Sequence, residues 1–528
     1  ARAAGWLAEH GRPVGALAHA ARTGDAEHIA ALLRHQAVPL LLAGEHTELR
    51  RALTVLGEAR IADDTLFALV SASLQLEGGE PGVAALHLAH ADAAWPRHPA
   101  PELVTLRRLV GSRLAQVAGD VEEMIRATDA AEPGQAPGLE PLVLLHRGTA
   151  LLAAGRPAEA GERAHAALEA AHEQGQGYVE IQCLTVLSGL AGAVGDVRSM
   201  IELARRAEAG ATEHGWQRTL ASAAAEVLLA YGALLRAEPA ECLRLATAAG
   251  RLVNGDPPPG TRSLSLVVGT LAGTARFETG AWTAGLREIH DARAAAGTRP
   301  LPNGQAALSA VLEHRAAVRF GWGELAQEVV NWSQWSIPDS GELALMRARD
   351  HLALGRPDSA GKILRPLLDG VMPTVLPWSV VEASLVDAEA ARLAGEDARA
   401  VRALKKALSG GRSLGVRYPL VFAAPEILEL LTAHRGRLGS LDPFAAEVLA
   451  VRRALDVPSL PVPLTNRERS VLRLLPTLRS FDEIAEDLTV SPNTVKTHVR
   501  SIYTKLGVKR RRDAVTVARE RGLLEDLP

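Results

Sequence analysis

The side chains best suited to making specific chemical contacts lie near the C-terminus, in residues 491–506. Read as a helix, this segment has one polar side made of amide, hydroxyl and cationic groups: Asn493, Lys496, Thr497, Arg500 and Thr504. Lysine and arginine donate to guanine edges, asparagine pairs with adenine, and a threonine methyl packs on thymine. This polar side therefore has the composition needed to enter the major groove of duplex DNA.

The opposite side of the same segment is aliphatic and predicts how the helix is held. Its residues recur at spacings of four, three and four: Val495, Val499, Ile502 and Leu506. Such spacing places them on one stripe, which packs against neighbouring helices. Because every surface helix has a polar side, spacing alone leaves both DNA contact and plain solvation open.

Local start and stop signals predict four short helices around this segment. The start signals are two capping boxes and one Ser-Pro cap: Thr465 with Glu468, Ser480 with Glu483, and Ser491 with Pro492. The second helix runs through Leu488, Gly507 ends the third, and the fourth covers about 509–521. A short helix, a tight turn and a longer helix form a helix-turn-helix arrangement.

The charge distribution separates this end of the chain from the rest. Although the 528 residues have a net charge of −3, residues 464–524 carry 13 basic and 7 acidic side chains and residues 1–463 carry a net charge of −7. A basic module on an acidic body favours a polyanion as the partner of that module.

The body of the chain, residues 1–455, has apolar residues at spacings of three and four, which predicts amphipathic helices. A turn containing glycine recurs at intervals near 36–40 residues or about twice that: Gly119, Gly155, Gly195, Gly280, Gly355 and Gly395. Degenerate copies lie at 234–242 and 319–327. Each glycine would end one helix in a left-handed conformation before Asp, Pro or Glu opens the next. The fold class is therefore all-α, with helix pairs stacked into a solenoid that resembles tetratricopeptide repeats.

Three prolines within 456–463 predict a linker between this solenoid and the C-terminal module. We therefore expect a solenoid over 1–455, a linker over 456–463 and a separate domain over 464–528.

The segment 464–524 as a whole resembles the LuxR-type helix-turn-helix domain of bacterial transcription regulators. The resemblance rests on "LTNRE", "VLRLL", "EIAEDL", "SPNTVKTHVRSIYTKLGV" and "AV", in that order. It implies that Lys496, Thr497 and Arg500 face bases. Around the third helix the residues assigned to DNA are Ser491, Asn493, Thr494, Lys496, Thr497, His498, Arg500, Ser501, Thr504 and Lys505.

The resemblance also implies that Thr494, His498 and Lys505 lie at phosphates. It places a dimer surface on the fourth helix, around Ala514, Val515 and Ala518. One turn departs from the family pattern, because Leu478, Arg479 and Ser480 stand where Gly-Leu-Ser is usual. Phe481 is the residue that would fill the space left by the displaced leucine.

A long helical-repeat region before such a module is similar to the arrangement of the large ATP-binding LuxR-type regulators. We therefore expect the sequence to be the C-terminal portion of a cytoplasmic regulator of this kind. The resemblance implies double-stranded DNA, RNA polymerase and a second copy of the chain as partners. It implies a small-molecule or protein effector for the solenoid and places any ATP site in a preceding domain, so we expect no cofactor here.

The sequence does not favour an enzyme, a metal site or a membrane protein. The nearest string to a phosphate loop, "GRPDSAGKI" (355–363), has the wrong spacing and ends in Ile363 where Ser or Thr would hold magnesium. The two cysteines, Cys183 and Cys242, lack zinc-ligand spacing, and no apolar run is long enough to predict a membrane span.

Three tryptophans occur within fourteen residues: Trp322, Trp332 and Trp335. They are either part of the core between repeats or an effector pocket on the groove of the solenoid. The sequence also leaves open a second class of function, in which the protein is an interaction scaffold and the altered turn has disabled its terminal module.

Overall fold

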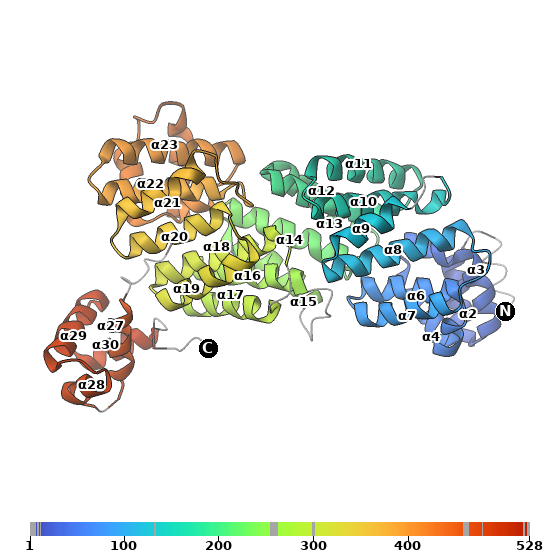
Figure 1. The fold of residues 1–528 in the computed structure, drawn as a ribbon, viewed down its shortest axis with the longest axis horizontal. Helices are drawn as coiled ribbons and strands as arrows, with labels where there is room; N and C mark the ends of the chain where they lie inside the picture. The colour runs from blue at the N-terminus through green and yellow to red at the C-terminus, as the bar shows by residue number, and fades with distance from the viewer. Residues whose placement is uncertain are drawn as a thin grey trace. The chain divides into compact units, whose positions relative to one another are not determined.

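The computed structural model describes residues 7, 10, 12–130, 134–253, 262–297, 301–457, 464–477, 479–520 and 523–524. Within these ranges the chain is α-helical throughout (Figure 1), with short 3-10 segments at Pro137–Leu139 and Gly439–Leu441 and no β-strand. The all-α prediction is therefore confirmed. Most of the linker predicted at 456–463 lies outside the described residues.

The first half of the repeat region consists of these helices: α2 (Pro13–Thr23), α3 (Ala26–Leu42), α4 (His46–Leu56), α5 (Glu58–Ala62), α6 (Thr65–Glu77), α7 (Pro81–Ala93), α8 (Pro101–Ala118), α9 (Val121–Asp129), α10 (Glu140–Ala153), α11 (Pro157–Glu173), α12 (Gly177–Val194) and α13 (Val197–Glu213). The second half consists of α14 (Leu220–Leu235), α15 (Pro239–Val253), α16 (Arg262–Glu278), α17 (Trp282–Ala296), α18 (Asn303–Phe320), α19 (Gly323–Ser336), α20 (Gly341–Ala353), α21 (Pro357–Leu368), α22 (Ser379–Leu393), α23 (Asp397–Leu414), α24 (Tyr418–Val421), α25 (Pro425–Ala433) and α26 (Asp442–Ala454). The C-terminal module has α27 (Asn466–Leu474), α28 (Phe481–Asp487), α29 (Pro492–Leu506) and α30 (Arg511–Glu520).

These helices belong to two compact units. Unit 1 comprises Ala1–Gly192, Arg198–Leu229 and Ala248–Ser265, and unit 2 comprises Ala193–Val197, Ala230–Thr247 and Leu266–Pro528. Unit 2 thus contains both the later repeats and the module that the sequence separates at residue 464.

Consecutive helices pair as antiparallel hairpins, as in α10 with α11, α18 with α19, and α22 with α23. The six glycines that recur along the sequence all adopt positive φ, between 70° and 100°: Gly119, Gly155, Gly195, Gly280, Gly355 and Gly395. At the two degenerate turns, Ala237 has φ of 61° and Gly321 has φ of 78°. The predicted turn chemistry is confirmed, because left-handed residues end the helices at the expected positions.

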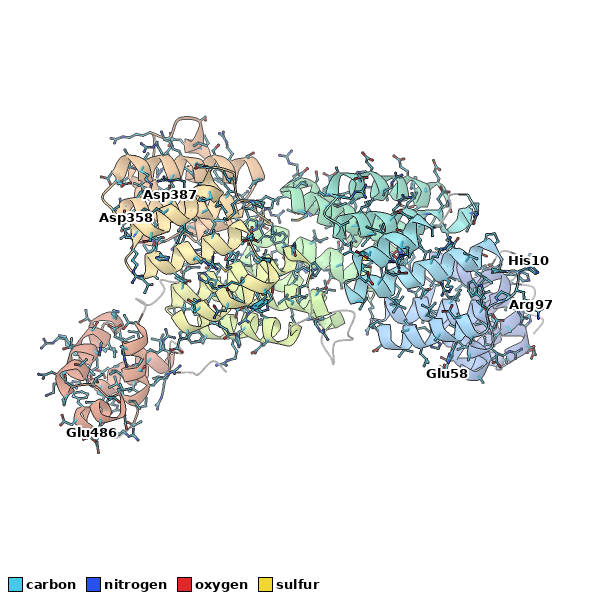
Figure 2. All side chains as sticks on the ribbon, in the orientation of Figure 1. His10, Glu58, Arg97, Asp358, Asp387 and Glu486 are labelled. Carbon is cyan, nitrogen blue, oxygen red and sulfur yellow. The ribbon has the colours of Figure 1, made fainter. Side chains whose placement is uncertain are left out.

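Small residues let the paired helices approach closely. Gly273 of α16 and Gly285 of α17 face each other so tightly that a Cβ on Gly273 would lie 2.5 Å from the Gly285 carbonyl oxygen. On α11 the residues that share the buried side are all alanines: Ala160, Ala164, Ala167 and Ala171. Across the α22–α23 hairpin, Asp387, labelled in Figure 2, accepts a hydrogen bond of 2.5 Å from Arg399.

The sequence predicts no apolar run long enough to span a membrane, but helix α12 is long and apolar enough to do so. Its 18 residues have a mean hydropathy of 1.3, so by length and composition it is able to cross a membrane. Val179 and Cys183 pack in the large apolar core of unit 1, and Ile181 and Leu184 pack with alanines of α13. An interior helix of a helical repeat has this same composition, because neighbours cover it on several sides.

Unit 2 buries charged residues that join its helices. The Glu278 carboxylate on α16 accepts from Arg319 of α18 at 2.7 Å and from the Tyr418 hydroxyl of α24 at 3.0 Å. Arg315 donates to the Phe422 carbonyl oxygen at 2.5 Å. The short helix α24 is therefore tied to residues about 100–140 positions earlier by charge-assisted bonds. Burial and the nearby Arg315 lower the pKa of the Arg349 guanidinium to about 9.

Replacing His146 with phenylalanine is expected to weaken the pH dependence of stability in unit 1. Burial, followed by repulsion from Arg113, lowers the pKa of His146 to about 3, whereas an unfolded histidine titrates near ~6.5. Because the unfolded chain takes up this proton first, stability is lost as the pH falls from about 6.5 toward 3. Between about pH 7 and about pH 5 this group removes about 2 kcal/mol.

Denaturant unfolding at the two pH values, followed by circular dichroism, measures this difference. His19→Phe on α2, where the imidazole is exposed, is the matched control and should keep the wild-type dependence. If the wild-type chain and His146→Phe lost the same free energy of unfolding between the two pH values, His146 would not be the source of the pH dependence.

Candidate nucleic-acid interface

The C-terminal module forms from the local signals in its sequence. Thr465 accepts from the Glu468 amide while the Glu468 carboxylate accepts from the Thr465 amide, and Ser480 and Glu483 make the same reciprocal bonds. Ser491 caps α29 by accepting from the Thr494 amide at 3.1 Å. Both capping boxes and the Ser cap are confirmed, whereas α28 ends one residue earlier than expected and α30 begins at Arg511, two residues later than expected.

Helix α29 has the two predicted sides. The aliphatic stripe is buried, with exposed fractions from 0% to 4%: Val495, Val499, Ile502 and Leu506. Helices α27, α28 and α30 all pack on α29. The polar side is exposed to solvent: Ser491, Asn493, Lys496, Thr497, Arg500 and Thr504. Two cationic and three hydroxyl side chains thus lie along an open helix surface, on the same side as the Asn493 amide.

Four of the ten residues assigned to DNA are only partly exposed: Thr494, His498, Ser501 and Lys505. The Ser501 hydroxyl donates to the Glu468 carboxylate at 2.6 Å, and the Lys505 ammonium donates to it at 2.7 Å. Burial raises the pKa of Glu468, but these two donors and the Thr465 amide outweigh that effect and lower it. Ser501 and Lys505 therefore join α29 to α27 through one carboxylate, a role the sequence reasoning did not identify.

The turn that departs from the family pattern is closed by Arg511 of α30. Its guanidinium donates to the carbonyl oxygens of Leu475 at 2.8 Å, Thr477 at 2.7 Å and Arg479 at 2.7 Å. It also lies over the half-buried Phe481 ring, 5.8 Å from the centroid. Leu478 lies outside the described residues. One cation thus satisfies three carbonyl groups in the segment that follows α27.

The structure corrects part of the predicted dimer surface. Ala514 and Ala518 are both 0% exposed, because they pack into the core of their own module. Val515 is half-buried and keeps some surface. Residues of α30 recur every three to four positions, so the alanines share the inner side while Val515 lies off it.

Helix α27 also contacts the turn between α18 and α19 within unit 2. Arg469 is 8% exposed and donates to the Gly321 carbonyl oxygen at 2.6 Å, and its guanidinium lies 5.3 Å from the Trp322 ring centroid. Burial, followed by repulsion from Arg473, lowers the pKa of Arg469 to about 10. The contact leaves the polar side of α29 open.

The three tryptophans lie in three different environments. Trp322 is 7% exposed and packs edge-on against Phe320, with ring centroids 5.1 Å apart. Trp332 is half-buried beneath Arg293, whose guanidinium lies 5.8 Å from its ring centroid, while Trp335 is 89% exposed. The structure therefore places the three rings in separate environments. The effector pocket suggested by the sequence stays a prediction.

Comparison with known proteins gives two separate likenesses. Residues 462–518 match the family described as "Bacterial regulatory proteins, luxR family". A relative from Vibrio cholerae, "HTH-type transcriptional regulator MalT", is 30% identical over 161 residues, which are 26% of this chain and 18% of that protein. The MalT of Cronobacter sakazakii is 44% identical over 75 residues, 13% of this chain and 8% of that protein. The chain thus matches less than a fifth of the length of these curated relatives.

The repeat fold has its own likeness among solved structures. The structure described as "Crystal Structure of Rap Protein Complexed with Competence and Sporulation Factor" aligns with a TM-score of 0.53 and 13% identity. The alignment covers 67% of this chain and 99% of that one. At this identity the likeness concerns the fold alone, and it agrees with the tetratricopeptide-like architecture.

Replacing Arg511 with alanine is expected to destabilise the C-terminal module by about 2 kcal/mol, because three carbonyl groups of the turn after α27, one of them partly buried, lose a charged donor. Amides of α27 and α29 should then exchange roughly 30-fold faster with deuterium. Hydrogen exchange of the full chain, followed by mass spectrometry, measures this change.

Arg512→Ala is the matched control, because Arg512 is the next residue of α30 and is exposed. It should change the free energy of opening, obtained from the exchange rates, by less than about 0.5 kcal/mol. Equal protection in the two variants would mean that Arg511 does not hold the turn.

Proposed function

We propose that this chain, whose C-terminal module is a LuxR-type helix-turn-helix domain, is a bacterial transcription regulator that binds duplex DNA through α29. The single observation that carries the proposal is the open polar side of α29, with Lys496, Thr497 and Arg500 exposed on a helix whose other side is fully packed. A rigid helix with long donors on its free side is able to enter a major groove.

The residues of α29 divide into two roles. Lys496, Thr497 and Arg500 read base edges, with Arg500 placed to donate to guanine acceptors. Thr494 and His498 approach the phosphate backbone, which fixes the position of the helix on the duplex, while Ser491, Asn493 and Thr504 are further contacts on the same exposed side.

Ser501 and Lys505 act on DNA indirectly in this proposal. Their bonds to Glu468 at 2.6 and 2.7 Å set the angle at which α29 leaves α27. A change in that angle moves Arg500 relative to any bound base, so the Glu468 carboxylate is a positioning group for recognition.

The other parts of the chain have supporting roles. Residues 1–455 form the repeat domain, 456–463 the linker and 464–528 the DNA-binding domain. The repeat domain receives an effector or protein partner in the cytoplasm, and a similar fold solved with Competence and Sporulation Factor supports such a role. Two copies bind adjacent half-sites through a surface of α30 that includes Val515, and the bound dimer contacts RNA polymerase.

The scaffold alternative loses its main support. It depended on the altered turn having disabled the terminal module, but Arg511 closes that turn with hydrogen bonds of 2.7–2.8 Å. Both capping boxes are intact as well.

Arg500→Ala is expected to weaken binding to a selected duplex by about 1–3 kcal/mol and to relax the preference at one base position. The duplex is first selected by the full chain at about 0.15 M salt, where sequence-independent phosphate contacts are partly screened. Fluorescence anisotropy with labelled duplex then gives the dissociation constants.

Arg519→Ala, which removes an exposed cation from α30, is the matched control for the loss of charge. It should weaken binding to the selected duplex and to a random duplex by the same small factor. If neither Arg500→Ala nor Lys496→Ala changed the dissociation constant for the selected duplex, α29 would be ruled out as the recognition helix.

A further inference from the structure

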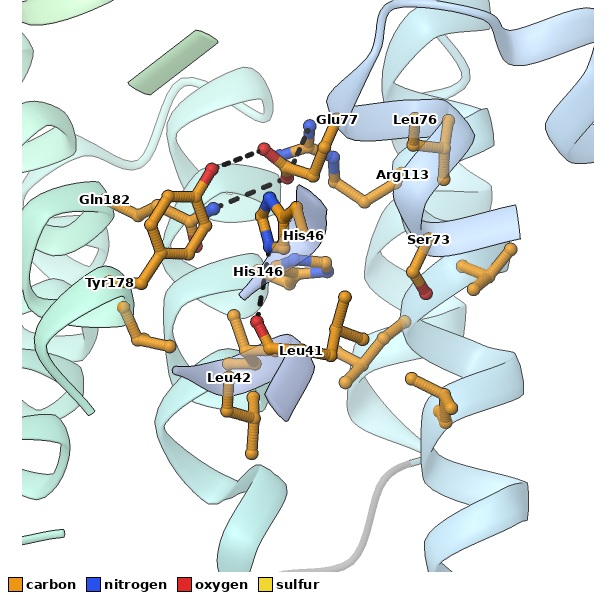
Figure 3. A pocket seen from close by; sticks show the side chains of 15 residues that line it. Leu41, Leu42, His46, Ser73, Leu76, Glu77, Arg113, His146, Tyr178 and Gln182 are labelled. Atoms are coloured by element: carbon orange, nitrogen blue, oxygen red, sulfur yellow. Dashed lines mark hydrogen bonds and ion pairs between the residues drawn. The ribbon is translucent and has the colours of Figure 1, made fainter. Parts of the chain in front are cut away.

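Unit 1 contains a partly open cavity of about 60 Å³ that DNA recognition does not use. Its walls come from α3, α4, α6, α8, α10 and α12, so residues more than 130 positions apart meet around it (Figure 3). One end of the cavity is polar and the other is aliphatic.

The polar end is organised around the Glu77 carboxylate of α6. The Tyr178 hydroxyl donates to it at 2.8 Å, Gln182 donates at 3.4 Å, and the Arg113 guanidinium lies 3.6 Å away (Figure 3). Glu77 and Arg113 neutralise each other, so this end of the cavity carries no net charge. Placing such groups inside a repeat otherwise rich in Ala and Leu costs desolvation energy, which a repeat built only for stability would avoid.

Two histidines complete the polar end. His46 is 6% exposed, with its Nε2 3.3 Å from the Leu41 carbonyl oxygen, and it packs edge-on against Tyr178. The Nδ1 atom of His146 is buried and has no hydrogen-bond partner among the residues that the structure describes. Burial lowers the pKa of both imidazoles, so both are uncharged near neutral pH. A neutral imidazole is able to donate through one nitrogen and accept through the other.

The aliphatic end is formed by side chains with little exposure to solvent, including Leu106 at 2%, Leu109 at 4% and Val110 at 2%. It offers dispersion contacts and no hydrogen-bonding group. A molecule that fits both ends must therefore have an apolar body and a hydrogen-bonding head.

We propose that this cavity is a binding site for a small uncharged molecule with an amide or hydroxyl head and a branched or cyclic apolar body. The proposal rests on the proposed function, because it assigns the effector of the repeat domain to a chemical class. An ionic ligand is disfavoured, since Glu77 is already matched by Arg113 and an extra buried charge would have no counter-ion. At about 60 Å³ the enclosed part is equivalent to roughly four to six waters, so the site takes a compact head group with its near substituents.

The test uses three probes of the same shape and different charge: isobutyramide, isobutyrate and isobutyramidinium. Saturation-transfer NMR with the full chain at millimolar probe should give binding of the amide at least tenfold tighter than binding of either ion. Equal signals from all three probes, or none from the amide, would overturn the proposal.

Variants locate the signal in the cavity. Ser73 lines the cavity and donates only within its own helix, to the Leu69 carbonyl oxygen at 2.9 Å. Ser73→Leu fills the space and should abolish amide binding. Thr54→Leu, an exposed position on α4 with the equivalent bond to Arg50 at 2.8 Å, is the matched control and should keep it. Tyr178→Phe keeps the ring and removes the hydroxyl that donates to Glu77. It should weaken binding severalfold, which keeps the test valid if Ser73→Leu does not fold.

Binding of the selected duplex is measured on the same samples. A chain that binds DNA through Arg500 but not isobutyramide overturns the cavity proposal alone. A chain that binds isobutyramide but reads no DNA supports the cavity and contradicts the proposed function.

Discussion

Close approach between paired helices is the constraint on which the rest of the structure depends. Aromatic residues make up only 3% of the chain, so large aromatic side chains are too few to fill the space between repeats. Instead, small residues bring backbones together, as where Gly273 faces Gly285 or where the Ala160 carbonyl oxygen lies 3.1 Å from a Cβ built on Gly148. No hairpin buries its own apolar side completely, so each depends on its neighbours and the turns between them must keep the pairs in register. Left-handed residues at those turns supply that register.

Polar groups inside such a tight repeat fall into two kinds with different consequences. In unit 2, Glu278 is matched by Arg319 and Tyr418 at hydrogen-bond distance, so its charge serves to fix α24 against α16 and α18. In unit 1, the groups around Glu77 leave a space, and the His146 ring keeps unused hydrogen-bonding capacity. A satisfied network rigidifies its surroundings, whereas unsatisfied groups beside a cavity are suited to a ligand.

In the C-terminal module, too, single charged groups each make several contacts. A single carboxylate, Glu468, completes the cap of α27 and holds two side chains of α29. A single guanidinium, Arg511, satisfies the carbonyl groups that an irregular turn would otherwise leave unpaired. With these contacts made on the inner side, the outer side of α29 makes hydrogen bonds only within its own helix, such as Thr497 to the Asn493 carbonyl oxygen at 2.9 Å and Thr504 to the Arg500 carbonyl oxygen at 3.0 Å. The cationic side chains of Lys496 and Arg500 on this side stay exposed to solvent, as the proposed binding to a duplex requires.

The sequence by itself determined the helices, the left-handed turns, the caps and the two sides of α29, because those features depend on hydrogen bonds and periodicities that span about four residues. Tertiary structure decided what depends on long-range contact. Packing turned Ala514 and Ala518 inward and Arg511 onto its turn, and drew Ser501 and Lys505 toward Glu468, more than 30 positions away. It also assembled the cavity from helices spread between α3 and α12. No local sequence pattern predicts these long-range contacts. In the sequence, the side chains that form them look like ordinary surface or core residues, and only the stacking of the helices brings them together.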